Sequence, residues 1–444
     1  MQQIAASRAR AVGSVSRQGA VAKENAVPPQ AGTSRIFATL MLLFFPLFRL
    51  SAMPTTVILS AARTPIGAFM GALSSLSAPE LGAIAIKAAL ERAGVSPEQV
   101  SEVIMGNVLT AGVGQAPARQ AALKAGLPTT TPCMTINKVC GSGLKAVMLA
   151  DQAIRCGDAE VVVAGGQESM SNAPYLLPKG RTGYRYGHGE VLDSMLLDGL
   201  TDAYDPQPMG VFADRCASSC GISRQQQDEY AIESYRRALR AQQEGLFADE
   251  IVPVTVRSGK SELTVTLDEE PQKVKFEKIP ELKPVFTKEG TVTAANASSI
   301  DDGAAALVLA SEQWASQHGR RPLARIVAQA TYAHDPADFN TAPIYSIERL
   351  LAKAGMSVAD VDLFEINEAF AVTALAAKQQ LGIPHEKLNV HGGAVALGHP
   401  IGASGARILT TLLYALRRYG KRYGVAALCI GGGEATAVLV ETVN

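Results

Sequence analysis

Two stretches of this chain, 261 residues apart, follow the same pattern of helix, turn and strand. Ile86–Met105 and Ile347–Ile366 each combine an apolar-periodic helix, a glycine turn, a polar helix start and an apolar strand. Further along, Ser142 and Ser404 each open another helical pattern that leads into an apolar strand. Two copies of helix, strand, helix and strand indicate a duplication built from parallel βαβ units. We therefore expect an α/β fold of two similar halves packed face to face.

The duplication divides the chain into three parts. Residues 1–52 form an N-terminal extension, residues 53–320 a first half and residues 321–444 a second half. The segment from about residue 171 to 290 interrupts the first half with a polar, turn-rich composition and one clear helix that starts at Ser223. We expect this segment to be a loop domain that covers a substrate.

Composition narrows the range of functions. The 444 residues carry no net charge, so a general nucleic-acid-binding surface is not expected. The chain is 47% hydrophobic and 5% aromatic, as in α/β proteins with an aliphatic core. Its six cysteines include no CxxC pair for zinc and do not form a disulfide scaffold in a chain of this length, which favours a reducing compartment. Cys216 and Cys220 share one helical face, where we expect packing rather than metal binding.

Residues 1–52 differ from the rest of the chain, because they are rich in Ala, Ser and Arg and contain a single acid, Glu24. Their apolar run, Ile36–Phe48, is too short to span a bilayer, and no membrane association is expected. Three interpretations remain open: sequence upstream of a true start at Met53, an organellar transit peptide, or a signal-like segment. We favour the first, which predicts a cytoplasmic protein whose extension is disordered or missing from the mature chain. The transit peptide would make it mitochondrial.

Cys140 and His399 are the strongest candidates for chemistry. Cys140 is followed by Gly-Ser-Gly, and His399 stands between Gly398 and Pro400, so both have backbone that permits close approach. Each lies just before a helix, and the two helices are equivalent in the two halves. A helix N-terminus favours a thiolate or an oxyanion, and a neutral imidazole can take the thiol proton. The pair suggests acyl transfer through a thioester.

Cys429 and Asn367 are further candidates for catalysis, and each also has a purely structural interpretation. Cys429 ends an apolar strand and enters Gly431-Gly432-Gly433. A second glycine-bedded thiol suggests a proton-transfer step, whereas packing at the end of the strand is the alternative. Asn367, in Asn-Glu-Ala-Phe, either caps a helix or uses its amide to hold a water or an oxyanion.

A basic stretch in the inserted segment also has two interpretations. It contains Lys273, Lys275, Lys278 and Lys283. These side chains either form a solvated surface or contact the phosphates of a nucleotide-bearing substrate, because a neutral chain needs a local patch to bind phosphate.

Taken together, these motifs resemble the thiolase family, and most closely its acetoacetyl-CoA branch, from about Thr55 to Val443. The matching segments are Asn137–Gly143, Gly165–Ser171, Gly290–Ser298, Asn367–Phe370, Gly392–Gly405 and Cys429–Gly433. The resemblance implies a five-layered α-β-α-β-α fold with a loop domain in the first half. It also implies a homotetramer or homodimer. The implied reaction is a reversible Claisen condensation of two acetyl-CoA to acetoacetyl-CoA and CoA through an acetyl-cysteine.

The resemblance also assigns catalytic roles. Cys140 would attack the acyl thioester, and His399 would activate it and donate to an oxyanion. Asn367, through a water, would share that oxyanion site. Cys429 would remove a proton from the methyl carbon of the second acetyl-CoA. Backbone N–H groups of Cys140 and Gly431 would form a second oxyanion hole, because an enolate is accessible only where donors stabilise it as it forms.

For substrate binding, the resemblance assigns Ser298 to the pantetheine arm and adds Met209, Phe339 and Phe370. Phe339 would narrow the acyl pocket. Pro208 departs from the pattern, because acetyl-specific members often carry a His before Met-Gly, whereas Pro is more like the degradative 3-ketoacyl-CoA thiolases.

No cofactor is required by this resemblance, since CoA is substrate or product. Some members of the branch hold a monovalent cation near the substrate loop. A potassium site here would use Tyr235, Ala294, Ala295, Ala297 and Val395.

Two other functions remain open. A 3-ketoacyl-CoA thiolase of fatty-acid β-oxidation is favoured by Pro208. A non-catalytic acyl-CoA- or lipid-binding protein on the same scaffold is disfavoured, because nothing would then require Cys140, His399 and Cys429 together. A decarboxylating ketoacyl synthase would pair its cysteine with two histidines, and this chain offers Cys429 instead.

Overall fold

The structure is a computed structural model that describes residues 54–258 and 261–443. The expected N-terminal extension, with its transit-peptide, signal and upstream-start alternatives, lies outside the described residues. Across the two described ranges, no helix combines the length and the apolar character that crossing a membrane requires.

Along the main path of the sheet, the first half contributes the strands β4-β3-β5-β10-β1 in this order. Their bounds are β1 Thr56–Arg63, β3 Glu102–Gly106, β4 Cys133–Ile136, β5 Val161–Ser169 and β10 Asp301–Ser311. β3 runs parallel to β4 and β5, as predicted for βαβ units, whereas β10 is antiparallel to β5 and β1. A two-residue strand, β2 (Gly67–Ala68), pairs with the start of β10.

The second half repeats this core in the order β12-β13-β14-β11. Its strands are β11 Ala324–Ala333, β12 Leu363–Ile366, β13 Tyr423–Ile430 and β14 Glu434–Thr442. β12 is parallel to β13, which corresponds to the β3–β5 pair of the first half. The two sheets also join at one edge, where Val57 and Ile58 of β1 pair with Arg325 and Ala324 of β11.

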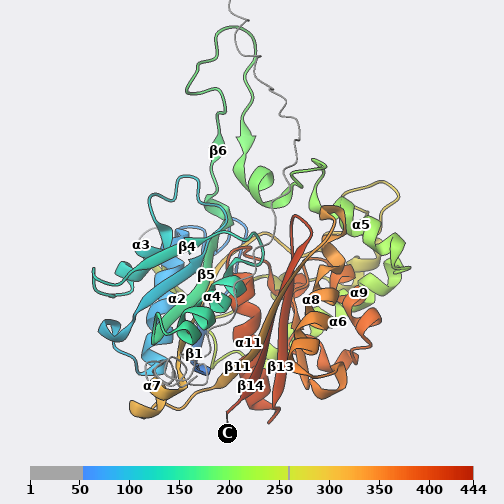
Figure 1. The fold of residues 1–444 in the computed structure, drawn as a ribbon. Helices are drawn as coiled ribbons and strands as arrows, with labels where there is room; N and C mark the ends of the chain where they lie inside the picture. The colour runs from blue at the N-terminus through green and yellow to red at the C-terminus, as the bar shows by residue number, and fades with distance from the viewer. Residues whose placement is uncertain (1–53, 259–260, 444) are drawn as a thin grey trace, which may run out of the picture. The chain divides into compact units, whose positions relative to one another are not determined.

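Helices complete the five layers that were expected (Figure 1). α2 (Ala78–Ala93) and α3 (Pro117–Lys124) cover the outer face of the first sheet, and α8 (Ala342–Ala354) covers the outer face of the second. α4 (Ser142–Cys156) and α11 (Ser404–Arg418) form the middle layer, because they pack on each other and on strands of both halves. The prediction of two similar halves in a five-layered fold is confirmed.

Two glycines allow the middle helices to meet at their N-termini. A Cβ on Gly143 would lie 2.7 Å from the Ala406 nitrogen, and a Cβ on Gly405 would lie within van der Waals overlap of the Leu144 nitrogen. Larger residues would force the helices apart. This contact brings the loops that precede both helices, and hence Cys140 and His399, to one place.

The inserted segment contains more helix than its composition indicates. The expected helix is α6 (Arg224–Gln243), and its start is confirmed by a capping box between Ser223 and Gln226. A second helix, α5 (Met209–Ser219), was not expected. The part between β6 (Tyr175–Leu176) and β7 (Leu192–Asp193) projects away from the sheets (Figure 1).

The remaining elements are short or peripheral. The α-helices are α7 Glu312–Gln317, α9 Ala371–Leu381 and α10 Ala394–Leu397, and the strands are β8 Val254–Ser258 and β9 Ser261–Val265. The short helical turns are η1 Pro97–Gln99, η2 Met170–Asn172, η3 Leu196–Leu200, η4 Glu270–Lys273, η5 Phe276–Glu281, η6 Pro336–Thr341, η7 Val358–Asp360 and η8 His385–Lys387.

Candidate active site

A cavity of about 330 Å³ brings together residues from both halves and from the inserted segment. Cys140, His399 and Gly431 line it, and so do the predicted substrate-binding residues, which are Met209, Ser298, Phe339 and Phe370. Its other lining residues are Val139, Met170, Leu196, Gly199, Leu200, Thr201, Pro208, Gly210, Phe286, Ala297, Ser299, Ile300, Ala369 and Ile401. The walls are mostly apolar, with a few polar groups at the cysteine, as in small-molecule sites.

Cys140 sits in a tight turn that leads into α4. The residue before it, Val139, has φ of 45°, which is strained for a β-branched side chain and is often found at functional sites. Ser142 stabilises the turn: its hydroxyl donates to the Val139 carbonyl (2.7 Å) and accepts from the Lys138 N–H (2.8 Å). A Cβ on Gly141 would overlap the end of the Ile430 side chain, which would have to move to make room for it.

The Cys140 thiol is held in its protonated form. Its side chain is partly accessible from the cavity, yet protein encloses it on the other sides. This burial raises the pKa of Cys140 to about 11, although hydrogen bonds from the N–H groups of Gly431 and Cys140 itself oppose the rise. The same two N–H groups were predicted as an oxyanion hole. The described residues give no hydrogen bond between Cys140 and His399, so their pairing stays a prediction.

His399 is fixed by bonds to its backbone and to its ring. The backbone N–H of His399 donates to Asp301 Oδ2 (2.8 Å), and its ring Nδ1 lies 2.6 Å from the Ser404 hydroxyl oxygen. That hydroxyl donates its single hydrogen to the Pro400 carbonyl (2.9 Å), so it accepts from Nδ1–H. The Nε2 atom therefore carries the lone pair. Burial and the nearby positive charge of Arg407 lower the pKa of His399 to about 3, which keeps the ring neutral.

Asn367 meets His399 rather than capping a helix. Its Nδ2 lies 3.5 Å from His399 Nε2, and both side chains are buried. The helix that follows, α9, begins at Ala371 with Phe370 in the cap position, so the capping alternative for Asn367 is wrong. The amide oxygen of Asn367 has no hydrogen-bond partner within the described ranges.

Cys429 is fully buried at the end of β13 and is not part of the cavity wall. Burial raises the pKa of its thiol, and a negative charge on Cys140 would raise this pKa further, so the two sulfurs are neighbours. Hydrogen bonds from its own N–H and from Thr373 act in the opposite direction. Thr373 was not anticipated from the sequence.

The far wall of the cavity is aromatic. The Phe370 ring makes edge-to-face contacts with Phe286 (centroids 6.2 Å apart) and with Phe339 (6.5 Å). Sequence reasoning missed Phe286, because it lies in a turn-rich segment whose path no local pattern reveals. Pro208 also lines the cavity, where it precedes α5.

The predicted cation ligands include four buried residues, which are Tyr235, Ala295, Ala297 and Val395, and one exposed residue, Ala294. Burial raises the pKa of the Tyr235 hydroxyl, and the nearby carboxyl groups of Glu270, Asp301 and Glu368 raise it further, so the phenol stays neutral.

Other candidate groups have structural partners. Lys273 pairs with Glu269 and Glu270, and Lys278 pairs with Glu281, as solvated side chains do. The sulfurs of Cys216 and Cys220 lie 3.9 Å apart. No group of three or more His, Cys, Asp or Glu that could hold a metal ion occurs in residues 54–258 and 261–443.

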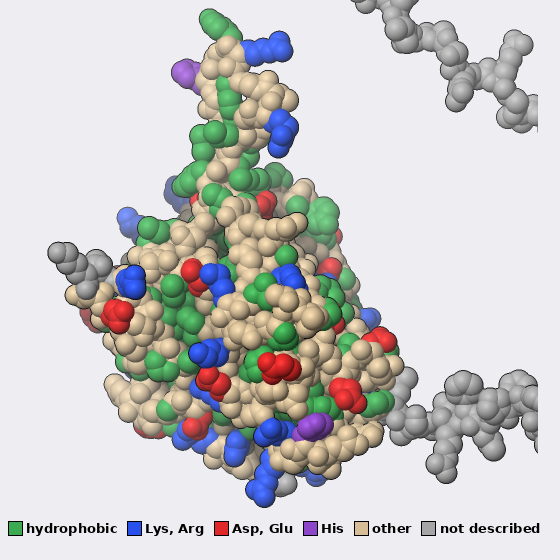
Figure 2. Space-filling view, turned by 90° about the vertical axis from the view of Figure 1, so that its left-hand side faces the viewer, with side chains coloured by type: hydrophobic (Ala, Val, Ile, Leu, Met, Phe, Trp, Pro, Cys, Tyr) green, Lys and Arg blue, Asp and Glu red, His purple; other side chains and the backbone are tan. Residues whose placement is uncertain are grey.

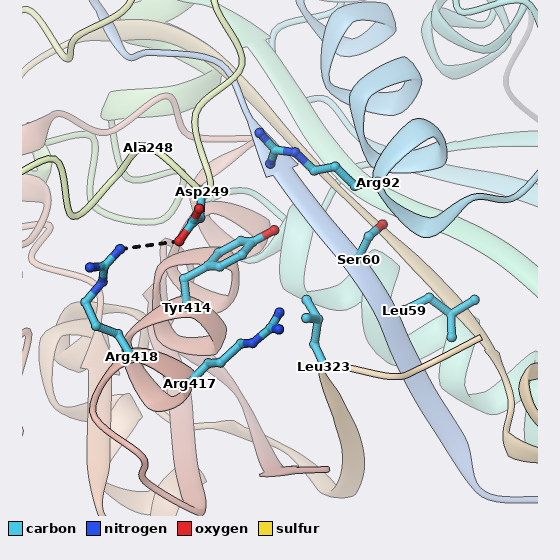
Figure 3. A pocket seen from close by; sticks show the side chains of 9 residues that line it. All are labelled: Leu59, Ser60, Arg92, Ala248, Asp249, Leu323, Tyr414, Arg417 and Arg418. Carbon is cyan, nitrogen blue, oxygen red and sulfur yellow. Dashed lines mark hydrogen bonds and ion pairs between the residues drawn. The ribbon is translucent and has the colours of Figure 1, made fainter. Parts of the chain in front are cut away.

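A second cavity, of about 690 Å³, shares no residue with the one at Cys140 (Figure 3). Arg92, Tyr414, Arg417 and Arg418 line it, and Arg418 pairs with Asp249 at 3.3 Å. Its lining contains neither cysteine nor histidine, so it offers no thiol–imidazole pair.

Known proteins share this sequence and fold. The chain matches the N-terminal domain of thiolase over residues 56–313 and the C-terminal domain of thiolase over residues 320–442. It is 54% identical over 391 residues to the acetyl-CoA acetyltransferase of Cupriavidus necator. The matched region covers 88% of this chain and 100% of that protein. It is also 54% identical over 387 residues to the mitochondrial acetyl-CoA acetyltransferase B of Xenopus laevis, covering 87% and 91% of the two chains.

A solved structure agrees with these relatives. The Acat5 thiolase of Ascaris suum, crystallised with coenzyme A, is 45% identical, with a TM-score of 0.84 over 88% of this chain and 100% of that one. The chain therefore belongs to the thiolase family. The prediction of family and fold from the motifs is confirmed.

Proposed function

We propose that this chain is an acetyl-CoA C-acetyltransferase that reversibly condenses two acetyl-CoA to acetoacetyl-CoA and CoA. One observation carries the proposal: Cys140, His399 and the Gly431 N–H, which come from different loops of the two halves, line one cavity. The relatives named acetyl-CoA acetyltransferase are 54% identical over most of their length, which supports acyltransferase activity and this reaction.

In the first step, Cys140 attacks the thioester of acetyl-CoA. The neutral His399 accepts the thiol proton on Nε2, which the Ser404 contact leaves free. The thioester C–S bond breaks, the acetyl group stays on Cys140, and CoA leaves with a proton. The N–H groups that already point to the Cys140 sulfur are placed to stabilise an oxyanion beside it.

In the second step, Cys429 takes a proton from the methyl group of another acetyl-CoA. The C–H bond breaks, an S–H bond forms on Cys429, and the electron pair enters the enolate, which attacks the acyl carbon of acetyl-Cys140. As the new C–C bond forms, the bond from that carbon to the Cys140 sulfur breaks, acetoacetyl-CoA is released, and the departing Cys140 thiolate takes the proton held by Cys429. Asn367, whose Nδ2 lies 3.5 Å from His399 Nε2, can donate to the enolate oxygen, directly or through a water. Both steps run backwards during thiolysis.

The lining of the cavity supports coenzyme A as the carrier. Ser298 and Ser299 stand on its wall, where a pantetheine arm can contact them. The acyl end is closed by Phe339 and Phe370, which favours a short acyl group. The related Ascaris thiolase was solved with coenzyme A.

A degradative 3-ketoacyl-CoA thiolase is the second candidate, and Pro208 favours it. This residue lines the cavity and forms an isolated bridge with Thr201, so it shapes the entrance from the inserted segment. The small volume of about 330 Å³ favours the C4 substrate instead.

Thiolysis of acetoacetyl-CoA beside 3-ketohexadecanoyl-CoA separates these candidates. We expect the C4 substrate to be cleaved faster, and Cys140→Ser to abolish the activity. Faster cleavage of the long substrate would make the chain a β-oxidation thiolase, and cleavage of neither would contradict both candidates.

A potassium ion at the Tyr235 site is also proposed. Neutral donors, namely the Tyr235 hydroxyl and main-chain carbonyls of residues 294, 295, 297 and 395, suit a monovalent cation, and the surrounding carboxylates favour positive charge. The ion would order the loop that carries Ser298. Potassium-dependent thermal stabilisation, with sodium as the control, tests this site.

We further propose that residues 53–320 and 321–444 are the two halves and that copies associate as a homotetramer or homodimer. The matched domains, 56–313 and 320–442, support the division. The projecting segment supports association, since it exposes apolar side chains, which are Tyr175, Leu177, Tyr184, Tyr186 and Val191 (Figure 2). The cytoplasmic or mitochondrial location depends on residues 1–52, and the relatives include a mitochondrial one.

A further inference from the structure

Two polar side chains, Thr373 and Asn340, are buried beside Cys429. Each has a relative exposure of 0%. Thr373 lies in the first turn of α9, and Asn340 lies in η6, which packs against both α9 and β13, the strand that carries Cys429. Their surroundings form a cluster of buried apolar residues that includes Phe339, Phe370 and Cys429. Polar groups in such a place are costly unless they are hydrogen-bonded.

The hydrogen bonds of these two residues leave one donor without a partner. The Thr373 hydroxyl donates to Asn340 Oδ1 at 2.6 Å, and Thr373 also lies close enough to the Cys429 sulfur to act on it as a hydrogen-bond donor. Asn340 Nδ2 is buried and has no hydrogen-bond partner within the described ranges. The oxygen and nitrogen of an amide occupy near-equivalent positions. A half-turn of the Asn340 amide therefore lets Nδ2 donate to Thr373, which frees the hydroxyl hydrogen for Cys429.

We propose that Asn340 and Thr373 form a hydrogen-bond relay that stabilises the thiolate of Cys429: the amide of Asn340 donates to the Thr373 oxygen, and the Thr373 hydroxyl donates to the sulfur. The relay rests on the proposed function, in which Cys429 is the base. Thr373 is a catalytic residue because it touches the reacting sulfur. Asn340 is a positioning residue because it acts through Thr373.

The chemistry of the second step requires such a donor. Cys429 must be a thiolate before it can take the methyl proton of acetyl-CoA. Burial opposes this charge, and so does any negative charge on Cys140 or on Cys216 of α5, both of which act electrostatically on Cys429. Beside its own N–H, the described residues offer Cys429 one side-chain donor, Thr373. A hydrogen bond to a charged acceptor is about twice as strong as a neutral one.

The test measures removal of the methyl proton of acetyl-CoA rather than the complete reaction. Exchange of the acetyl-CoA methyl protons with deuterated water reports proton removal by Cys429, whereas acetylation of Cys140, followed by mass spectrometry, reports the first step alone. Thr373→Val removes the hydroxyl at nearly constant volume, and Thr373→Ser retains it. Asn340→Asp removes the amide donor. Thr410→Val is the matched control, since Thr410 is also fully buried and donates to a helix carbonyl at 2.8 Å.

We expect Thr373→Val to slow methyl exchange on the order of 10-fold or more, because it removes a hydrogen bond to a charged group. Its exchange profile should move to higher pH, while acetylation of Cys140 keeps its wild-type rate. Asn340→Asp should show a smaller loss in the same direction, and Thr373→Ser should restore exchange.

Wild-type exchange rates in Thr373→Val, or an equal loss in Thr410→Val, would overturn the relay. If the wild-type protein neither acetylates Cys140 nor cleaves acetoacetyl-CoA, the proposed function fails instead. The acetylation readout thus separates the two outcomes.

Discussion

Ser404 holds the imidazole of His399 in one tautomer: its hydroxyl oxygen lies 2.6 Å from Nδ1 and gives its hydrogen to the Pro400 carbonyl. The helix that begins at Ser404 thus orients the general base that precedes it in the chain. Because the lone pair is left on Nε2, the ring can accept a proton on the side that faces Asn367.

Loss of this contact should slow the reaction without weakening substrate binding. Ser404→Ala lets the ring adopt both tautomers, and we expect kcat for acetoacetyl-CoA thiolysis to fall roughly 10-fold or more, with little change in KM. Steady-state kinetics measure both constants. A variant with the wild-type kcat would show that Ser404 does not orient His399.

The reactivity of Cys140 should depend steeply on pH. Because the thiol has a raised pKa of about 11 and His399 is neutral, the resting pair is thiol and imidazole rather than an ion pair. The rate of alkylation by iodoacetamide should rise about tenfold per pH unit from pH 7 upward, as the thiolate fraction does. A rate that is flat above pH 6 would indicate a preformed thiolate–imidazolium pair and contradict this description.

Acid should destabilise the fold through two buried histidines. The pKa of His399 is lowered to about 3 and that of His391 to about 4, both mainly by burial. Below pH 6.5 the unfolded chain therefore binds more protons than the folded chain. As a result, the free energy of unfolding decreases as the pH falls from about 6.5 to about 3. Burial of Glu168 and Glu365 raises their pKa values to about 7 and about 8, which acts in the opposite direction between pH 4.5 and 8.

The histidine effect should consequently be visible below about pH 4.5, where these glutamates are protonated in both states. We expect His391→Gln to flatten the acid limb by on the order of 1 kcal/mol between pH 4.5 and 3, because the pKa of His391 in the folded chain, about 4, lies inside this range. Urea unfolding at several pH values measures it. An unchanged slope would mean that His391 is already protonated in the folded protein.

The close contact between α4 and α11 should not tolerate a larger residue. Gly405→Ala places a Cβ against the backbone of Leu144, and we expect a loss of about 1–3 kcal/mol in the free energy of unfolding. Because the same contact seats Cys140 and His399, kcat should fall as well. Gln152→Ala on the exposed side of α4 is the control. Equal stability of the two variants would show that the helices can separate freely.

The repeat in the sequence predicted the two halves because each copy carries its own helix and strand periodicity, which is a local property. The glycine-rich turns at Cys140 and His399 were visible for the same reason. Contacts between segments far apart in the chain were not. Phe286 and Thr373 have no local motif. Phe286 acquires its place only when the inserted segment packs against the second half, and Thr373 only when α9 packs against η6.

Ser404 illustrates the limit most clearly. The sequence marked it as the start of a helix, but its bond to His399 depends on how the turn between Pro400 and Ser404 closes. Whether Asn367 caps a helix or contacts His399 could likewise be decided only from the residue at which α9 begins.

The central claim is that Cys140 carries the acetyl group. Incubation with acetyl-CoA alone, followed by peptide mass spectrometry of the wild type and of Cys429→Ser and Cys140→Ser, tests it most directly. We predict one acetyl group on Cys140 in the wild type and in Cys429→Ser, and none in Cys140→Ser. Acetylation of another residue, or an unmodified Cys140 in a folded protein, would contradict the account.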